Sequence, residues 1–222
     1  MKFKAYLLDI EGTTTPIDFV TRTLFPFARA RLDQVELTES EARLLAVERE
    51  EDQRTGAMPP QLVAPYLSWL MDQDRKSTGL KSVQGRIWES GYKDGELRGE
   101  LYPDVLPAMK RWRMAGSKVA IFSSGSVHAQ KLLFGHSVEG DLTGLIDGYF
   151  DTTTGGKREP ESYVRIAESL KIKPSEICFL SDIIEEVDAA KLAGFHSFQV
   201  CRDDSITTTV LQITKFDSDC LV

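Results

Sequence analysis

Four short apolar runs, each followed by polar residues, constrain most strongly what this chain of 222 residues can fold into. They occupy residues 5–10, 118–123, 177–181 and 196–201. Helical patterns separate the later runs. Apolar runs of this length that alternate with helices are typical of parallel strands whose two faces are both covered. The sequence therefore predicts an α/β fold built on a parallel sheet.

Three stretches beside these runs carry helical spacing. They read "YPDVLPAMKRWRMAG", "PESYVRIAESLKI" and "EEVDAAKLAG", and the last is closed by Gly194. In the second stretch one apolar stripe is predicted, consisting of Tyr163, Val164, Ile166, Ala167 and Leu170. The final residues, "TTTVLQITKFDSDCLV", are interpreted as a further strand and a tail.

The segment from 19 to 100 differs from the rest of the chain. Its stretches "VTRTLFPFARARLDQV", "ESEARLLAVEREEDQ", "PQLVAPYLSWLMDQDRK" and "LKSVQGRIWESGYKDGEL" show spacings near 3.6 residues and little strand character. We interpret it as an all-helical insertion after the first strand. The predicted domains are therefore a sheet-containing core, 1–18 with 101–222, and a helical insertion, 19–100.

Composition narrows the possible partners. The chain is 41% hydrophobic and 27% charged, as in ordinary globular proteins. Its net charge of −7 argues against nucleic acid or an anionic membrane as the main partner. The three cysteines, an odd number without paired spacing, indicate reduced thiols and neither a disulfide framework nor a zinc site. With no secretory signal and no run long enough to span a bilayer, a cytoplasmic protein is expected.

Polar residues just after the apolar runs predict a binding site. Asp9 and Glu11 follow the first run, 123–126 ("SSGS") follows the second, and Asp182 follows the third. Lys157 lies in the glycine-rich "TTTGGKREPE" before a helix. Because an open α/β sheet binds ligands beyond the carboxyl ends of its strands, these groups can converge on one pocket.

The carboxylates in this set predict a cation site. Asp9 and Glu11, two residues apart on an extended segment, point to the same face, where a cation or a shared proton must relieve their repulsion. Oxygen ligands suit Mg²⁺; Asp182 can supply one more, and Glu186 follows one turn later on the same side. Most single acids only cap helices or face water. For Asp9 that interpretation is weaker, because a carboxylate that ends a buried strand is costly unless it is paired or coordinated.

The serines and the lysine suit an anion. "SSGS" joins a strand to a helix and offers hydroxyls and free helix N–H groups, although a serine there is usually just a cap, and most lysines are surface charges. Together with the acids they describe phosphoryl transfer through an aspartyl-phosphate. Asp9 would attack phosphorus, Ser123 and Lys157 would hold the phosphate, and Glu11 would protonate the leaving oxygen and then activate water.

These residues resemble the four motifs of the haloacid-dehalogenase-type phosphohydrolases. The motifs are "DIEGTTT" from Asp9, "FSSGS" from 122, Lys157, and "SDIIEEVDAA" from 181. The resemblance implies a Rossmann-like core with an inserted helical cap at 19–100. Most phosphatases of that superfamily carry aspartate two residues after the nucleophile, whereas this chain has Glu11.

The glutamate is similar to that of the acireductone synthases, the enolase-phosphatases of methionine salvage, as are "TPIDFV", "LFPFA", "IWESGYKDGEL" and "SSGSVHAQKLLFGHS". This resemblance implies enolisation and then dephosphorylation of 2,3-diketo-5-methylthiopentyl 1-phosphate, which yields the acireductone. It implies one Mg²⁺ per chain, held by Asp9, Glu11 (through its backbone carbonyl) and Asp182. It implies substrate-phosphate contacts from Ser123, Ser124 and Lys157, and a monomer.

Two questions stay open at this point. The enolisation base is not fixed by the residues, since Glu11, a cap residue or a metal-bound hydroxide would each serve. Aromatic residues of the cap can line a methylthio pocket, but packing is the commoner role for Phe19, Phe25, Trp88 and Tyr92.

The alternative functions are a general phosphatase of small phosphate monoesters and a non-enzymatic phospho-receiver module. Receiver modules are roughly half this size, which leaves the helical segment unexplained.

Overall fold

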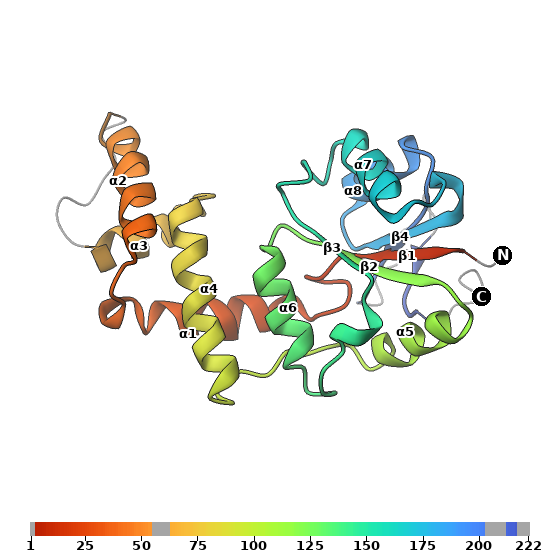
Figure 1. Cartoon of the computed structure of the whole chain (residues 1–222), viewed down its shortest axis with the longest axis horizontal. Coiled ribbons are helices and arrows are strands. Elements are labelled where there is room, and N and C mark those ends of the chain that lie inside the picture. Colours follow the sequence, from red (N-terminus) through yellow and green to blue (C-terminus); the bar gives the residue numbers. More distant parts are fainter. Residues whose placement is uncertain (1–2, 55–62, 203–211, 217–222) are drawn as a thin grey trace. The chain divides into compact units, whose positions relative to one another are not determined.

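The structure, a computed structural model, describes residues 3–54, 63–202 and 212–216. The chain divides into two compact units (Figure 1). One consists of residues 1–19 with 98–222, and the other of residues 20–97. The sequence placed its two domain boundaries at 18/19 and 100/101. That these units act as a catalytic core and a cap stays a prediction.

The first unit contains a six-stranded sheet of order β3-β2-β1-β4-β5-β6 in which every neighbouring pair is parallel. The strands are β1 (Ala5–Leu8), β2 (Lys118–Phe122), β3 (Gly148–Phe150), β4 (Ile177–Ser181), β5 (His196–Val200) and β6 (Gln212–Ile213). The predicted α/β fold with a parallel sheet is confirmed. β6 lies in the predicted last strand region, whereas the three-residue β3 was not predicted.

Both faces of this sheet are covered by helices, which explains why its strands are apolar throughout. The helices are α5 (Val105–Met114), α6 (Val127–Gly135), α7 (Pro160–Leu170) and α8 (Ile184–Leu192), and Figure 1 shows α7 and α8 on the opposite side of the sheet from α5. Ala5 and Leu7 of β1 belong to the apolar cluster that α7 and α8 complete. Tyr6 points to the other face, where its ring stacks on Trp112 of α5 at 3.9 Å between centroids. Alternate residues of β1 therefore join two separate layers of the core.

The apolar stripe predicted for α7 is correct except at one residue. Tyr163, Ile166, Ala167 and Leu170 are buried at the expected spacing, but Val164 is 41% exposed. At about 100° per residue, Val164 lies about 120° from Leu170 and about 160° from Ile166 around the helix, which places it beyond the edge of the buried stripe. Ser162 is buried in place of Val164.

The second unit is helical in all its described elements. These are a π-helix at Phe19–Leu24, which begins one residue before the unit, α1 (Phe25–Arg29), a 3₁₀ turn at Leu32–Gln34, α2 (Glu39–Arg54), α3 (Val63–Asp72) and α4 (Thr78–Lys93). The first predicted helix is therefore broken into three pieces. Pro26 lies in the first turn of α1, and because proline lacks a backbone N–H it favours a new helix start there over continuation.

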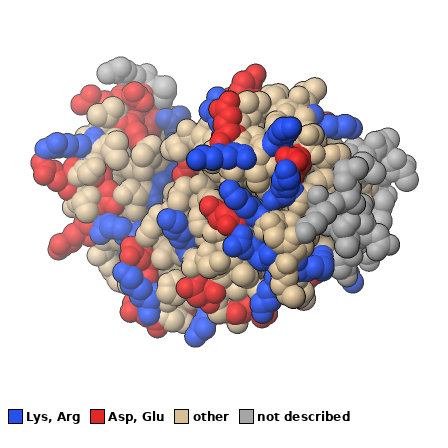
Figure 2. Space-filling view, turned by 45° about the vertical axis from the view of Figure 1, so that its right-hand side comes forward, with Lys and Arg blue, Asp and Glu red and all other residues tan. Residues whose placement is uncertain are grey.

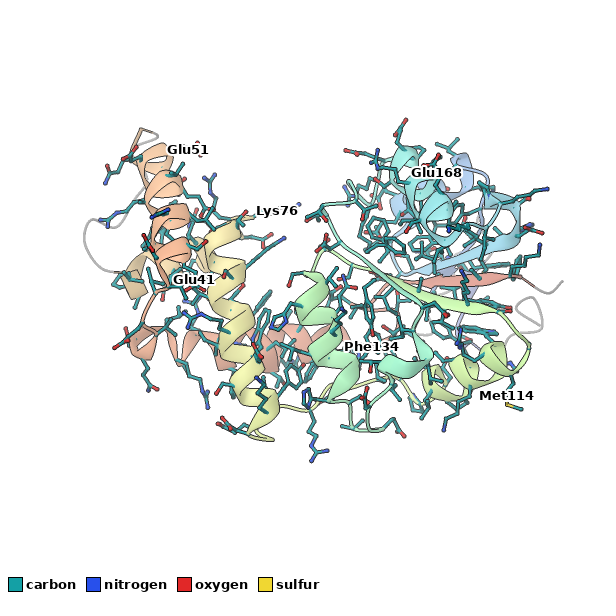
Figure 3. The ribbon with its side chains drawn as sticks, in the orientation of Figure 1. Glu41, Glu51, Lys76, Met114, Phe134 and Glu168 are labelled. Atoms are coloured by element: carbon teal, nitrogen blue, oxygen red, sulfur yellow. The ribbon has the colours of Figure 1, made fainter. Side chains whose placement is uncertain are left out.

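Glu41 holds the helices of this unit together from a buried position (Figure 3). Its carboxylate accepts hydrogen bonds from Arg86 Nε at 2.9 Å and Nη2 at 2.8 Å, and from the Ser82 hydroxyl at 2.9 Å, both on α4. Thr38 and Glu41 also form a reciprocal capping box at the start of α2. Burial alone would raise the pKa of Glu41, but Arg86, Thr38 and Ser82 together lower it to about 2.

Replacing Glu41 with glutamine is expected to lower the free energy of unfolding by roughly 2–3 kcal/mol at pH 7. Because the folded pKa of about 2 lies below the ordinary 4.5, this stabilisation is present above pH 4.5 and is lost as the pH falls towards 2. Urea denaturation of both proteins at several pH values measures the difference. Glu39→Gln is the matched control, since the Glu39–Arg43 pair on the same helix is exposed. An equal loss in both variants would contradict the assignment.

Charge is distributed without an extended basic area on the face in view. Figure 2 shows acidic and basic side chains interspersed there. Single apolar residues are exposed at helix ends, such as Met114 at the end of α5 (Figure 3). Within the part of the chain that the structure describes, no helix combines the length and apolarity needed to cross a membrane.

Candidate active site

The first strand delivers Asp9 into a tight turn beyond its carboxyl end. The backbone N–H of Asp9 still continues the sheet by donating to Leu180 O at 3.0 Å. The next residues then fold back, because the N–H groups of Thr13, Thr14 and Thr15 all donate to Ile10 O at 2.9–3.1 Å. Gly12 has a φ of +74°, a conformation that favours glycine. We call residues 9–15 the Asp9 turn.

Asp9 is buried, and each carboxylate oxygen has a partner. Lys157 forms an ion pair with Oδ1. The Thr13 hydroxyl donates to Oδ2 across 3.4 Å, which is long for a hydrogen bond. Oδ2 therefore keeps lone pairs available for a ligand or an electrophile.

Lys157 reaches Asp9 from the loop between β3 and α7, and it is also buried. Its ammonium forms a second ion pair with Glu186 Oε2 at 2.7 Å. The Tyr163 hydroxyl donates to its backbone carbonyl at 2.6 Å and so ties the loop to α7. Burial alone would lower the pKa of Lys157, but the charges of Asp9 and Glu186 outweigh burial and raise it, so the side chain stays charged.

Glu186 on α8 is oriented towards Lys157. Its Oε2 also accepts a hydrogen bond from the Ser181 hydroxyl at 2.8 Å. The sequence predicted that Glu186, one turn after Asp182, would face the same way as Asp182. The charges of Glu186 and Asp182 do influence each other, yet the side chain of Glu186 pairs directly with Lys157. Glu186 thus holds the ammonium that neutralises Asp9.

The Glu11 side chain is directed towards the end of β2, which lies on the opposite side of β1 from β4. The Ser123 hydroxyl at the end of β2 donates to Glu11 Oε2 at 3.3 Å and accepts from the Gly125 N–H at 3.0 Å. Burial, followed by the charge of Asp9, raises the pKa of Glu11. Ser123 is fully buried, whereas Ser124 beside it is exposed. The structure therefore brings Ser123 to the acids but gives Ser124 a different environment.

The turn that follows Ser123 is fixed by one buried side chain, Gln130, and by two half-buried ones. Gln130 on α6 donates its amide to Gly125 O and Phe150 O, each at 2.8 Å. Asp151 accepts from the Val127 N–H at 3.1 Å, and the Ser126 hydroxyl accepts from Ala129 N at 3.2 Å as the N-cap of α6. This geometry leaves the Ser123 hydroxyl beside Glu11 and close in the chain to the start of α6, an arrangement that suits an anion.

The chain is similar to known proteins in both sequence and fold. Residues 3–194 match the family model described as haloacid dehalogenase-like hydrolase. This chain belongs to that family. It is 50% identical to "Enolase-phosphatase E1" of Synechococcus elongatus, with 96% of this chain and 94% of the relative covered. It is 51% identical to the protein of that name from Sorangium cellulosum, over 90% of this chain and 88% of the relative.

The solved structures agree with this assignment. The UTR4 protein of Saccharomyces cerevisiae aligns with a TM-score of 0.79 at 32% identity, covering 97% of this chain and 99% of that one. The resemblance seen in the sequence is therefore confirmed. A haloacid dehalogenase-like hydrolase is an enzyme, so the phospho-receiver interpretation is set aside.

Haloacid dehalogenase-like hydrolases generally use Mg²⁺, and the donors of this site fit such an ion. Asp182 Oδ1 is buried without a hydrogen-bond partner among the described residues. Burial, and then the charge of Asp9, raises the pKa of Asp182 to about 7. Both observations indicate that the Asp182 carboxylate lacks enough nearby positive charge to stabilise its ionised form. A side chain at Gly12 would collide with Asp182, since an added Cβ would lie 2.3 Å from its Oδ2.

The described residues contain no group of three or more His, Cys, Asp or Glu side chains arranged to hold a metal ion. A metal ion at this site would therefore not be coordinated by protein side chains alone. Mg²⁺ commonly takes one or two carboxylates and completes its shell with water and substrate phosphate, and backbone carbonyls also serve as oxygen ligands. The predicted set, two carboxylates and the Glu11 carbonyl, fits that pattern.

Two residues important to this site were not singled out by the sequence. Thr13 connects its parts, because its hydroxyl donates to Asp9 Oδ2 and accepts from the Asp182 N–H at 2.9 Å. Arg202 donates from Nε and Nη2 to the Thr13 carbonyl at 2.9 and 2.6 Å. Arg202 directly follows the fourth apolar run, 196–201, so examining the residue after that run would have found it.

Proposed function

We propose that this protein is a magnesium-dependent enolase-phosphatase that converts 2,3-diketo-5-methylthiopentyl 1-phosphate into the acireductone and phosphate. One observation carries the chemistry: a buried aspartate at the end of the central strand, ion-paired to a buried lysine and adjacent to a second acid bonded to a serine. Relatives named "Enolase-phosphatase E1", which are 50% and 51% identical to this chain, support the proposed substrate.

One Mg²⁺ would be held by the Asp9 and Asp182 carboxylates and by the Glu11 carbonyl. When bound, the ion supplies positive charge that stabilises the phosphoryl oxygens and a developing enolate. Its ligands come from two neighbouring strands, since β1 pairs directly with β4. Thr13 bridges these two ligand loops through its hydroxyl.

Phosphate transfer follows from the remaining groups. Lys157 and the Ser123–Gly125 turn position the phosphate, while Asp9 forms a bond to phosphorus and the bond to the substrate oxygen breaks. Glu11 gives its proton to the departing oxygen, a role favoured by its raised pKa. Glu11 then removes a proton from water, which attacks the acyl-phosphate and regenerates Asp9. Ser124 is expected to contact the phosphate from its exposed position.

The test of this function is to mix the protein with the diketone phosphate and Mg²⁺. The expected result is a transient enol absorbance followed by free phosphate. A panel of small phosphate monoesters is assayed in parallel. Strong hydrolysis of monoesters without turnover of the diketone phosphate would identify a general phosphatase and overturn the proposed substrate.

Replacing Glu11 with glutamine separates the acid–base steps. Glutamine keeps an oxygen for the Ser123 hydrogen bond but cannot transfer a proton, so phosphate release should fall by roughly 10²–10⁴-fold. Enol formation, followed in the same sample, reports whether Glu11 also acts as the enolisation base. The exposed Glu185→Gln serves as the control. If both steps kept the wild-type rate in Glu11→Gln, this residue would have neither role.

A further inference from the structure

Arg202, whose side chain is 9% exposed, contacts the Asp9 turn, and no step of the reaction uses it. Two of its N–H groups converge on a single acceptor, the Thr13 carbonyl. That carbonyl accepts none of the backbone hydrogen bonds described within the turn, which use Ile10 O and Thr15 O as acceptors. Arg202 therefore supplies the partner that the turn itself does not provide for Thr13.

Thr13 transmits this contact to the reacting carboxylate. The residue is fully buried, and its hydroxyl lies between Asp9 Oδ2 and the Asp182 N–H. A shift of the Thr13 backbone would therefore move the partner of Asp9 and the anchor of the Asp182 loop together. Catalysis is sensitive to such shifts, because a misplacement of about 1 Å can cost about 10²-fold in rate.

Arg202 is itself held rigidly. Its Nη1 donates to both carboxylate oxygens of Asp104, at 2.9 and 2.8 Å. Its guanidinium lies over the rings of Tyr102 and Phe216, at 4.2 and 4.7 Å from their centroids. A guanidinium with an ion pair and two aromatic neighbours has little freedom to move.

Asp104 holds Arg202 and leaves its own helix, α5, without a side-chain cap. It occupies the N-cap position of α5, where an aspartate side chain usually accepts a helix N–H, yet it makes no such bond. Its carboxylate instead accepts from Arg202 and from the Phe216 N–H at 2.7 Å. The neighbouring Tyr102 N–H donates to Thr14 O at 3.0 Å, so the segment before α5 holds the next carbonyl of the same turn.

We propose that Arg202 is a positioning residue that fixes the Asp9 turn through the Thr13 carbonyl and so aligns Asp9 for attack on phosphorus. This positioning role rests on the proposed phosphatase chemistry but not on the identity of the substrate. Arg202 acts from behind the turn, without contact with the substrate. Its loss should therefore lower kcat while leaving KM close to the wild-type value.

The experiment compares Arg202→Gln, Arg202→Lys and Arg111→Gln. Arg111 is the matched control, because its Nη2 donates to the Phe216 carbonyl at 2.6 Å and so supports the same C-terminal segment. We expect kcat of Arg202→Gln to fall about 10- to 100-fold with less than about a threefold change in KM. Arg202→Lys keeps the charge towards Asp104 but not the paired donors, so an intermediate kcat is expected.

Each variant is assayed with the diketone phosphate and with p-nitrophenyl phosphate, and its melting temperature is measured. A normal kcat in Arg202→Gln, or an equal fall in Arg111→Gln at an equal loss of melting temperature, would overturn the positioning role. If the wild type hydrolysed only p-nitrophenyl phosphate and Arg202→Gln still lowered that kcat, the proposed substrate would fail while the positioning role stood. A wild type that hydrolysed neither ester would overturn both.

Discussion

Replacing Asp9 with asparagine is expected to reduce phosphate release by at least about 10³-fold, because the amide cannot form the bond to phosphorus. Asparagine has nearly the same shape, and its carbonyl oxygen can still accept a hydrogen bond from Lys157, so the fold should be retained. Free phosphate is measured under saturating substrate. Acid-quenched wild type should in addition carry one phosphoryl group on the peptide that contains Asp9, and the variant should carry none.

The control for this substitution is Asp188→Asn, which removes an exposed carboxylate from the adjacent α8. Its phosphate release should equal that of the wild type. Phosphate release by Asp9→Asn above about a tenth of the wild-type rate would show that Asp9 is not the nucleophile. Enol absorbance in the same samples reveals whether enolisation requires the Asp9 charge.

The strands of the sheet could be predicted wherever burial on both faces made them continuously apolar. β1, β2, β4 and β5 were expected within one or two residues of where they lie. β3 was missed because it has only three residues, begins with a glycine and is half-buried, so neither length nor pattern distinguishes it from a loop. The π-helix at Phe19–Leu24 was missed for a related reason, since its spacing resembles that of an α-helix.

The position of the site could be predicted from topology, but its pairings could not. In a parallel sheet the carboxyl ends of neighbouring strands meet at one edge, so Asp9, Ser123 and Asp182 had to lie close together. The partner of Lys157 depends on how the loop before α7 meets α8. The sequence related Glu186 to Asp182, which precedes α8, but only three-dimensional packing brings Lys157 between Glu186 and Asp9.

The arginine behind the turn shows the same limit. Its place after β5 is visible in the sequence, and there the chain reaches the carboxyl edge of the sheet for the fifth time. Its partners come from three segments, which are the Asp9 turn, the residues before α5, and Phe216 near the end of the chain. No local pattern relates residues so far apart.

Lys157→Met is expected to lower both activity and stability, because it leaves two buried carboxylates, Asp9 and Glu186, without their shared cation. Breaking a buried ion pair by removing one partner typically costs about 3–5 kcal/mol in the free energy of unfolding. Phosphate release should fall by about 10²-fold or more, since the phosphate loses its main positive contact. Urea denaturation and steady-state kinetics measure the two effects.

A double-mutant cycle with Glu186→Gln tests the physical reason for the stability loss. If repulsion between Asp9 and Glu186 destabilises Lys157→Met, then removing the Glu186 charge in that background should recover part of the lost free energy, whereas Glu186→Gln alone should destabilise the protein. Activity should not recover, because the positive charge for the phosphate is still absent. Additive losses in the double variant would mean that Lys157 and Glu186 do not interact in the free energy of unfolding, and repulsion between Asp9 and Glu186 would then not explain the loss in Lys157→Met.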